Sequence, residues 1–356
     1  MPWFESNNRV PMTETHANLR RLKLIWPLLL LVFILVVGTG GTAIHLSRFY
    51  RTPQGDPATT LIYTINRGQS FNTTARQLVE AGLCSSETKL RFMATVYGLD
   101  KKIKAGEYRL SGAMTPEEIL TVLTRGKVHL RKLTIPEGYT VKQIADVVEQ
   151  SGLGEAALIM DLCFSEPFTR RMELPEEAPS LEGYLFPETY LFEKGTSEEA
   201  ILAAMVGRFK AVFTEELQQE GKALGLSPNQ VVTLASIIEK ETGAPSERPI
   251  ISSVFHNRLK KRMRLETDPT VIYGIKDFNG NITRKDLRRR TPYNTYVIKG
   301  LPPGPIASPG LAALTAAVRP EDTGYLYFVS KKDGSHHFSR TFKEHSRAVR
   351  KYQLNR

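Results

Sequence analysis

A long apolar segment near the N-terminus sets the first limit on how this chain folds. Between Ile25 and Leu46 only His45 is ionisable, and this length matches the roughly 20 apolar residues that one helix needs to cross a bilayer. More basic residues precede the segment than follow it, which favours a cytoplasmic N-terminus. We therefore predict a cytoplasmic tail at residues 1–21 and a single transmembrane helix at residues 22–47 in the inner (plasma) membrane. The bulk of the chain is then periplasmic; a cleavable signal peptide is the alternative interpretation.

The remainder of the chain alternates between strand and helix signals and predicts an α+β fold. Of its 356 residues, 41% are hydrophobic and 24% are charged, which is typical of globular domains and argues against a disordered chain. Residues 48–60 are rich in Pro, Gly and Thr and are predicted to form a linker. Residues 61–126 follow a β-α-α-β order with one further helix, which resembles a LysM module, a small glycan-binding fold; a generic α+β subdomain without a ligand is the alternative. Residues 127–356 are predicted to form a larger mixed α+β domain.

Two carboxylates lie at the end of one predicted helix in this larger domain. Ser227 and Gln230 have the spacing of a capping box, and the apolar helix that they begin ends at Gly243. At about 100° per residue, Glu239 and Glu241 fall on opposite flanks of the buried stripe, so the two side chains do not point into one cleft. A carboxyl group among apolar side chains resists ionisation, and a general acid needs its proton at neutral pH. Periodicity slightly favours Glu239 as that acid; for either residue, a solvated position at the helix end is the alternative.

A series of short motifs surrounds this helix along the sequence. They are LEG at 181–183, FPETY at 186–190, LASIIEKET at 234–242, SER at 246–248, VFHNRL at 254–259, LETDPTVIYG at 265–274, YNTY at 293–296, GLPPGP at 300–305 and GSH at 334–336. In type and order these motifs resemble those of the endolytic murein transglycosylase family, the YceG-like proteins. With the apolar segment and the LysM-like module, the resemblance covers nearly the whole chain beyond residue 20.

The resemblance implies a reaction and a catalytic residue. In the family the first Glu of the E-K-E-T run is the catalytic acid, which corresponds to Glu239. The bond cut is the β-1,4 linkage between N-acetylmuramic acid and N-acetylglucosamine within glycan strands, and the product ends in a 1,6-anhydro sugar. A single carboxyl suffices, whereas ordinary glycosidases use a carboxylate pair. The resemblance implies no cofactor and no metal; it also implies that growing strands are terminated beside glycan-polymerising and division enzymes.

Seven further polar or aromatic residues are candidates for binding the sugar. They are Glu182, Glu188, Asn257, Asp268, Tyr293, Asn294 and His336. Each has a structural alternative, such as a turn cap for Glu182, a contact between helices for Asn257, or a turn initiator for Asp268. Tyr293 could simply pack, and His336 could be a hairpin side chain.

The alternative function is a non-catalytic scaffold that holds peptidoglycan near the synthesis machinery. The net charge is +11, and residues 258–290 hold eleven Lys or Arg against four Asp or Glu, which suits an anionic polymer; a solvated helical face is the alternative. We do not expect nucleic-acid binding, because no recognition motif is present and the domain is predicted to lie outside the cytoplasm. Cys84 and Cys163 match no metal or redox spacing, so two isolated buried thiols are favoured over a disulfide.

Overall fold

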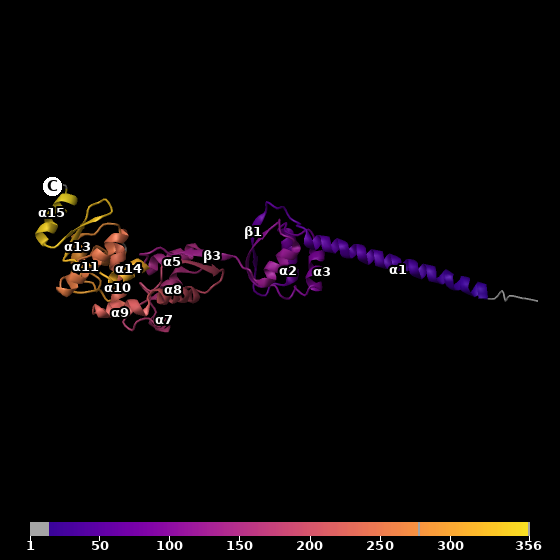
Figure 1. Cartoon of the computed structure of the whole chain (residues 1–356), viewed down its shortest axis with the longest axis horizontal. Helices are drawn as coiled ribbons and strands as arrows, with labels where there is room; N and C mark the ends of the chain where they lie inside the picture. The colour runs from indigo at the N-terminus through magenta and orange to yellow at the C-terminus, as the bar shows by residue number, and fades with distance from the viewer. Residues whose placement is uncertain (1–13, 277, 355–356) are drawn as a thin grey trace, which may run out of the picture. The chain divides into compact units, whose positions relative to one another are not determined.

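The structure, a computed structural model, describes residues 14–276 and 278–354 of the chain (Figure 1). It divides into two compact units, which we call unit 1 (Met1–His129) and unit 2 (Leu130–Arg356). The division lies close to the boundary predicted after residue 126. The three β-sheets among the described residues are all two-stranded and antiparallel, so the fold is mixed α+β, as predicted.

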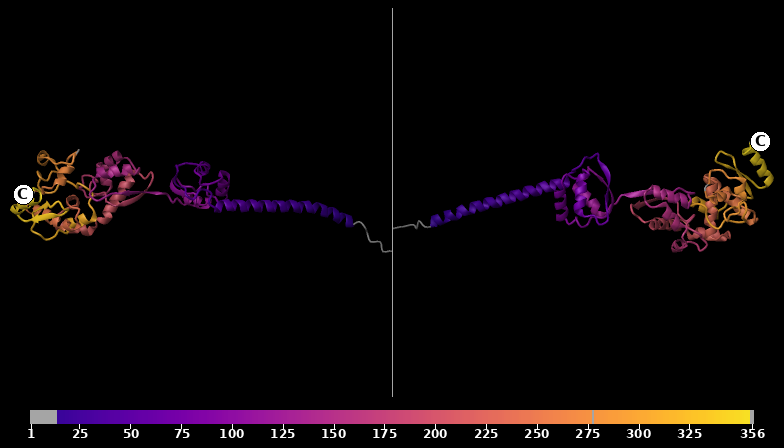
Figure 2. Two further views of the ribbon diagram at one scale, coloured as in Figure 1. Left: turned by 90° about the horizontal axis from the view of Figure 1, so that it is seen from above. Right: turned by 180° about the vertical axis from the view of Figure 1, so that it is seen from behind.

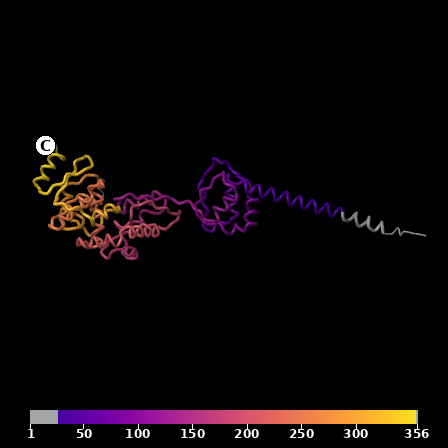
Figure 3. Tube along the Cα trace, viewed as in Figure 1, coloured from indigo at the N-terminus to yellow at the C-terminus, as the bar shows by residue number. Residues whose placement is uncertain are grey.

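The apolar segment forms the long helix α1 (Glu14–Arg51), and the part of it that Figure 3 draws in indigo is one unbroken coil. Its part from Trp26 to Arg51 contains a stretch of 18 residues with a mean hydropathy of 2.3 and is long and apolar enough to cross a membrane, which fits a membrane anchor. Of the predicted tail, residues 1–13 lie outside the described residues and the remainder is helical. The predicted end of the helix at residue 47 differs from the structure. Phe49 and Tyr50 are 5% and 4% exposed in the core of unit 1, and their burial continues α1 into the segment predicted as linker.

Unit 1 has the predicted β-α-α-β order. Strand β1 pairs with β2 in a register that runs from Thr60 opposite Ser111 to Ile65 opposite Gly106. Each of the three helices after α1 follows a Ser or Thr whose side chain accepts a hydrogen bond from the amide of the third helical residue, which satisfies an otherwise free amide. The elements after α1 are β1 (Thr60–Ile65), α2 (Phe71–Glu80), α3 (Glu87–Val96), β2 (Gly106–Ser111) and α4 (Pro116–Arg125). The identity of this module as a LysM domain stays a prediction.

The first half of unit 2 packs helices against one β-ribbon. Strand β3 pairs with β4 from Leu130 opposite Glu193 to Thr134 opposite Thr189, and apolar side chains from this ribbon and its helices form one core. The elements are β3 (Leu130–Thr134), α5 (Val141–Gln150), α6 (Ala156–Cys163), α7 (Glu166–Arg171), β4 (Thr189–Glu193) and α8 (Glu198–Val212). Helix α8 ends where Phe213 and Thr214 leave the helical conformation, and Thr214 is the N-cap of the next helix.

The second half of unit 2 is built around α10, which packs against α9, α11, α12 and α14. Figure 2 shows this part of the chain in two further views. Its elements are α9 (Glu215–Ala223), α10 (Pro228–Glu241), the 3-10 turn η1 (Pro245–Glu247), α11 (Arg248–Lys260), α12 (Asp268–Tyr273), α13 (Arg284–Arg288), α14 (Leu311–Val318), β5 (Tyr327–Ser330), β6 (His336–Ser339) and α15 (Phe342–Tyr352). Strands β5 and β6 form an antiparallel hairpin, which runs from Tyr327 opposite Ser339 to Ser330 opposite His336.

Both cysteines are free and buried, Cys84 in unit 1 and Cys163 in unit 2. Burial raises the pKa of the Cys84 thiol to about 12 and that of the Cys163 thiol further. Both are therefore neutral thiols at physiological pH, and the prediction of two isolated thiols is confirmed.

Candidate active site

Helix α10 carries the two candidate acids and is fixed at its start by the predicted capping box. Ser227 accepts a hydrogen bond from the Gln230 amide, and the Gln230 side chain accepts one from the Ser227 amide. Nine residues of this helix are buried, so its rotation about its own axis is set by the core. The directions in which Glu239 and Glu241 point follow from that rotation.

Glu239 points into a polar niche. Its side chain is 6% exposed; one carboxylate oxygen accepts a hydrogen bond from Arg248 Nη2 at 3.1 Å and the other accepts one from the Gly310 amide at 3.1 Å. The sequence predicted a shield of hydrocarbon neighbours around this group. The structure instead surrounds the buried carboxylate with a guanidinium and a backbone amide, which stabilise its charged form.

A second carboxylate, Glu137, lies beside the same guanidinium. Its Oε2 is 3.8 Å from Arg248 Nη2, and its side chain is 49% exposed, so it lies at the open side of the niche. Burial, together with the negative charge of Glu239, raises the pKa of Glu137, while Arg248 opposes that shift. Sequence reasoning missed Glu137. The only local signal is its place in the turn before the capping box of α5, and nothing in that turn points to Arg248.

The loop that carries Glu137 is attached to the loop that precedes α14. The Gly138 amide donates to the Ser308 carbonyl at 2.8 Å, and the Ser308 amide donates to the Tyr139 carbonyl at 2.8 Å. The Lys240 ammonium donates to the Gly138 carbonyl at 3.2 Å. The niche is therefore assembled from four separate segments of unit 2, which supply Glu137, Glu239, Arg248 and Gly310.

Glu241 faces a different part of unit 2, as the helical spacing predicted. The Thr267 hydroxyl donates a hydrogen bond to its Oε1. Burial raises the pKa of Glu241 to about 7, with Asp268 adding to the shift and Thr267 opposing it. Glu241 therefore has the protonation behaviour that the sequence argument assigned to Glu239.

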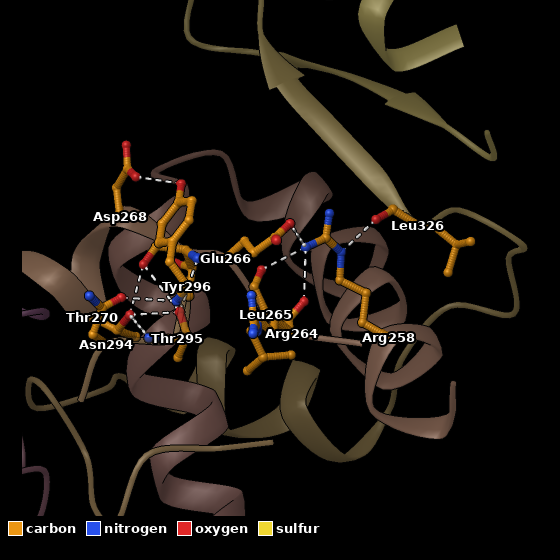
Figure 4. A network of polar contacts seen from close by, with 11 residues as sticks. Arg258, Arg264, Leu265, Glu266, Asp268, Thr270, Asn294, Thr295, Tyr296 and Leu326 are labelled. Carbon is orange, nitrogen blue, oxygen red and sulfur yellow. Dashed lines mark hydrogen bonds and ion pairs between the residues drawn. The ribbon is translucent and has the colours of Figure 1, made fainter. Parts of the chain in front are cut away.

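A hollow of about 330 Å³ adjoins Glu241. Figure 4 shows part of its wall: the Tyr296 hydroxyl donates to Asp268 at 2.7 Å, and Arg258 lies between Glu266 and the Leu326 carbonyl. Asp268 and Arg258 are thus occupied by neighbouring groups. Because Arg258 is 8% exposed, it is not part of a solvated basic face.

An apolar groove of about 470 Å³ lies on the Lys240 side of the niche. Lys240, which directly follows the candidate acid on α10, is one of the groove's lining residues. Three lysines line it, Lys142, Lys240 and Lys276, and its one acidic lining residue is Glu182. Its positive charge thus exceeds its negative charge.

Of the candidate sugar-binding residues, Glu182 lines this groove, and Tyr293 contacts Tyr273, another of its lining residues. Glu182 lines it, is 3% exposed and accepts hydrogen bonds from the Val141 amide and the Tyr273 hydroxyl. It therefore also caps the first turn of α5, which was the structural alternative. The Tyr293 ring packs against Tyr273, with ring centroids 4.8 Å apart.

The remaining candidates stabilise other parts of unit 2. Asn257 donates to the Thr323 and Tyr325 carbonyls, and His336 binds Glu247 through its Nδ1 at 2.6 Å. Asn294 is 1% exposed and donates to three carbonyls around the end of α13, and Glu188 pairs with Arg208 of α8. Among the described residues, no hydrogen bond or ion pair joins these side chains to Glu239. Within the same part of the chain, no group of three His, Cys, Asp or Glu side chains is arranged to hold a metal ion.

The chain is similar to known proteins over most of its length. The YceG-like family matches residues 63–351. An endolytic murein transglycosylase of Bacillus subtilis (strain 168) is 34% identical over 327 residues, which cover 88% of this chain and 90% of that protein. An endolytic murein transglycosylase of Streptococcus pneumoniae (strain D39) is 31% identical over 80% of this chain and 57% of its own length. A yceG-like protein of Listeria monocytogenes, with a crystal structure at 2.6 Å, is 35% identical, covers 81% of this chain and 98% of its own, and superposes with a TM-score of 0.58.

Proposed function

Because this chain belongs to the YceG-like family of lytic transglycosylases, we propose that it is anchored in the inner membrane by α1 and cuts peptidoglycan strands endolytically with Glu239. The orientation that we propose has the N-terminus in the cytoplasm and unit 2 in the periplasm. The observation that carries the assignment of Glu239 is its environment. It is a nearly buried carboxyl at the end of α10 whose two oxygens are held separately by Arg248 and the Gly310 amide.

The proposed reaction uses this one carboxyl twice. Protonated Glu239 gives its proton to the glycosidic oxygen between N-acetylmuramic acid and N-acetylglucosamine as the bond from C1 to that oxygen breaks. The resulting carboxylate takes the proton from the C6 hydroxyl of the muramic acid residue as its oxygen bonds to C1. The strand therefore ends in a 1,6-anhydro sugar, no water is consumed, and Glu239 regains its proton.

The partners of Glu239 support the middle of this cycle. Between the two proton transfers Glu239 is a carboxylate in a site from which most water is excluded, and an unpaired charge there is costly. Arg248 and the Gly310 amide donate to that carboxylate. Hydrogen bonds to a charged group contribute about 1.5–3 kcal/mol each, and the two fix the orientation of the carboxyl.

The anchor and the neighbouring groove support the proposed biological role. A helix that crosses the bilayer keeps the active unit near the membrane surface, where new strands emerge. We propose that cleavage there terminates strand elongation beside the glycan-polymerising and division enzymes. A scaffold that binds strands without cutting them is the alternative.

The test is an analysis of product ends. The full-length chain in detergent micelles is incubated with isolated glycan strands, and the new ends are identified by mass spectrometry before and after borohydride reduction. We expect anhydro ends, which borohydride leaves unchanged. Ends that are all reducible would indicate a hydrolase, and binding without new ends would indicate the scaffold.

Two matched variants test the catalytic residue. Glu239→Gln keeps the shape of the side chain but cannot donate a proton, so we expect cleavage to fall by at least about 10³-fold, the range of general acid catalysis. Glu241→Gln removes a carboxyl two residues further along the same helix and should keep cleavage within a few-fold of the parent chain. Activity that survives in the first variant and disappears in the second would transfer the role to Glu241.

A further inference from the structure

Two carboxylates approach a single nitrogen of one guanidinium in the niche of unit 2. Arg248 Nη2 lies 3.1 Å from Glu239 Oε1 and 3.8 Å from Glu137 Oε2. The reaction proposed above uses one carboxyl only, so it leaves Glu137 without a role. The position of Glu137 indicates a role, because two negative charges this close to each other are unfavourable unless a cation or a shared proton compensates them.

Glu137 is held in place by the backbone around it. The loop of residues 137–139 is joined to Ser308 by two backbone hydrogen bonds and to α10 by Lys240. Gly310 completes the arrangement: its amide donates to Glu239, and a Cβ on it would lie 1.8 Å from Glu137 Oε1. The absence of a side chain at this position therefore lets both carboxylates approach the same residue.

The guanidinium between the two carboxylates is incompletely bonded. The Arg248 side chain is 10% exposed, and its Nε is buried without a hydrogen-bond partner in the described part of the chain. A buried guanidinium usually satisfies its donors. Nη2 of Arg248 is 3.1 Å from Glu239 Oε1 and 3.8 Å from Glu137 Oε2. Because these distances are similar, a slight rotation of the Arg248 side chain transfers its closest contact from Glu239 to Glu137.

The charged groups facing Glu239 are then few. They are Arg248 from α11 and Glu137 from the loop after β3, while the Lys240 ammonium is engaged by the Gly138 carbonyl. A guanidinium with no other acidic partner would hold Glu239 in its ionised form. Glu137 supplies the compensating negative charge.

We propose that Glu137 is a positioning residue that competes with Glu239 for Arg248 and so allows Glu239 to hold the proton needed for the first step. This inference rests on the proposed function. When Arg248 turns to Glu137, Glu239 loses its cation and holds a proton, which comes from solvent before the first turnover and from the C6 hydroxyl of the previous sugar afterwards. After that proton has passed to the glycosidic oxygen, Arg248 returns to the Glu239 carboxylate. The C6 hydroxyl then returns a proton to Glu239 and Arg248 turns back to Glu137, so each turnover consumes no net proton.

The experiment is a pH profile of bond cleavage by the full-length chain in detergent micelles. The initial rate of strand cleavage is measured for the parent chain, Glu137→Gln, Glu137→Asp and Glu239→Gln, with Glu176→Gln as the control for removal of an exposed carboxyl from the same unit. In the Glu137→Gln variant, Glu239 is the one carboxylate left beside the Arg248 guanidinium in this niche. We expect the alkaline limb of its profile to move to lower pH by about one unit, the smaller end of the range for a neighbouring charge.

This shift corresponds to a loss of about tenfold in rate on the alkaline side, with recovery at lower pH. Glu137→Asp draws the carboxylate back from Arg248 and should shift the limb in the same direction by less, which keeps the test valid if the Gln variant does not fold. Glu176→Gln should leave the limb in place, and Glu239→Gln should be inactive throughout.

Two results would overturn the inference. One is a rate that falls equally at every pH in both Glu137 variants, which would mean a purely structural role. The other is a profile that does not change. The proposed function is tested separately, with the parent chain alone, because anhydro product ends decide between a transglycosylase and a hydrolase. The alkaline limb of the pH profile can be measured whichever kind of cleavage occurs. A parent chain that cuts no strand at all would overturn both.

Discussion

Replacing Glu182 with Gln should remove a large part of the pH dependence of unit 2 stability. Glu182 is 3% exposed, and its carboxylate accepts hydrogen bonds from the Val141 amide at 3.1 and 3.2 Å and from the Tyr273 hydroxyl at 3.2 Å. Burial outweighs these bonds and raises the pKa of Glu182 to about 7. The folded state therefore binds the proton more tightly than the unfolded state does.

The sign and size of the effect follow from linkage. The group contributes its full stability below the unfolded pKa of 4.5, and this contribution is lost as the pH rises through the folded pKa of about 7. At about 1.36 kcal/mol per pKa unit, the loss amounts to roughly 3 kcal/mol in the free energy of unfolding. A Gln side chain has nearly the same shape, can accept from the Val141 amide, and carries no charge at any of these pH values. In the variant this loss should be absent.

The two free cysteines provide the assay. Because Cys163 is buried in unit 2 and Cys84 in unit 1, pulsed thiol labelling in urea with peptide mass spectrometry reports the unfolding of each unit separately. Labelling of Cys163 gives the free energy of unfolding of unit 2 in the parent chain and in Glu182→Gln. We expect the difference between the two chains to change by about 3 kcal/mol between about pH 4 and about pH 8, so that the variant gains stability relative to the parent at the higher pH. The midpoint at Cys84 should be the same in both chains. An equal pH dependence of the two chains at Cys163 would refute the reasoning from burial.

Two further predictions concern residues placed by the structure. Asn294→Ala leaves three carbonyls around α13 without their donor and should lower the free energy of unfolding of unit 2 by about 2–3 kcal/mol, measured in urea. The control Asn281→Ala, at an exposed position, should change it by less than about 0.5 kcal/mol. Equal effects of the two substitutions would contradict the capping role of Asn294. Replacing Lys142, Lys240 and Lys276 together by Gln should raise KM several-fold more for strands that carry acidic stem peptides than for denuded strands, because the groove loses its three cations. The same rise in KM on both substrates would show that the groove does not select the stems.

Local signals predicted most of the elements correctly. A capping box joins residues only three apart, so the starts of α4, α5 and α10 could be identified from Thr115, Thr140 and Ser227 without knowledge of the fold. The helical repeat likewise separated Glu239 from Glu241 correctly. The start of α9 has a local signal of the same kind, because Thr214 is followed by two Glu.

The partners of the candidate site residues could not be predicted from the sequence. Asn294 and His336 were chosen because polar groups in loops often bind ligands; in the structure their partners are the carbonyls around α13 and Glu247, and their part in sugar binding stays a prediction. The hydrocarbon shield expected around Glu239 was an extrapolation from its neighbours on α10. The groups that face it, Arg248 and Gly310, come from other segments.

The sequence by itself determined the long apolar segment and the element order of both units. These are consequences of hydropathy, caps and periodicity, each of which acts over a few neighbouring residues. The carboxyl assigned to catalysis was indicated by the resemblance of the E-K-E-T run to the family motif. Only the tertiary structure decided that Glu137 and Glu239 approach one guanidinium and that Glu182 caps α5. The physical reason is that such contacts join residues far apart along the chain, and they depend on how α10 is rotated in its core and on where the loop before α14 is attached.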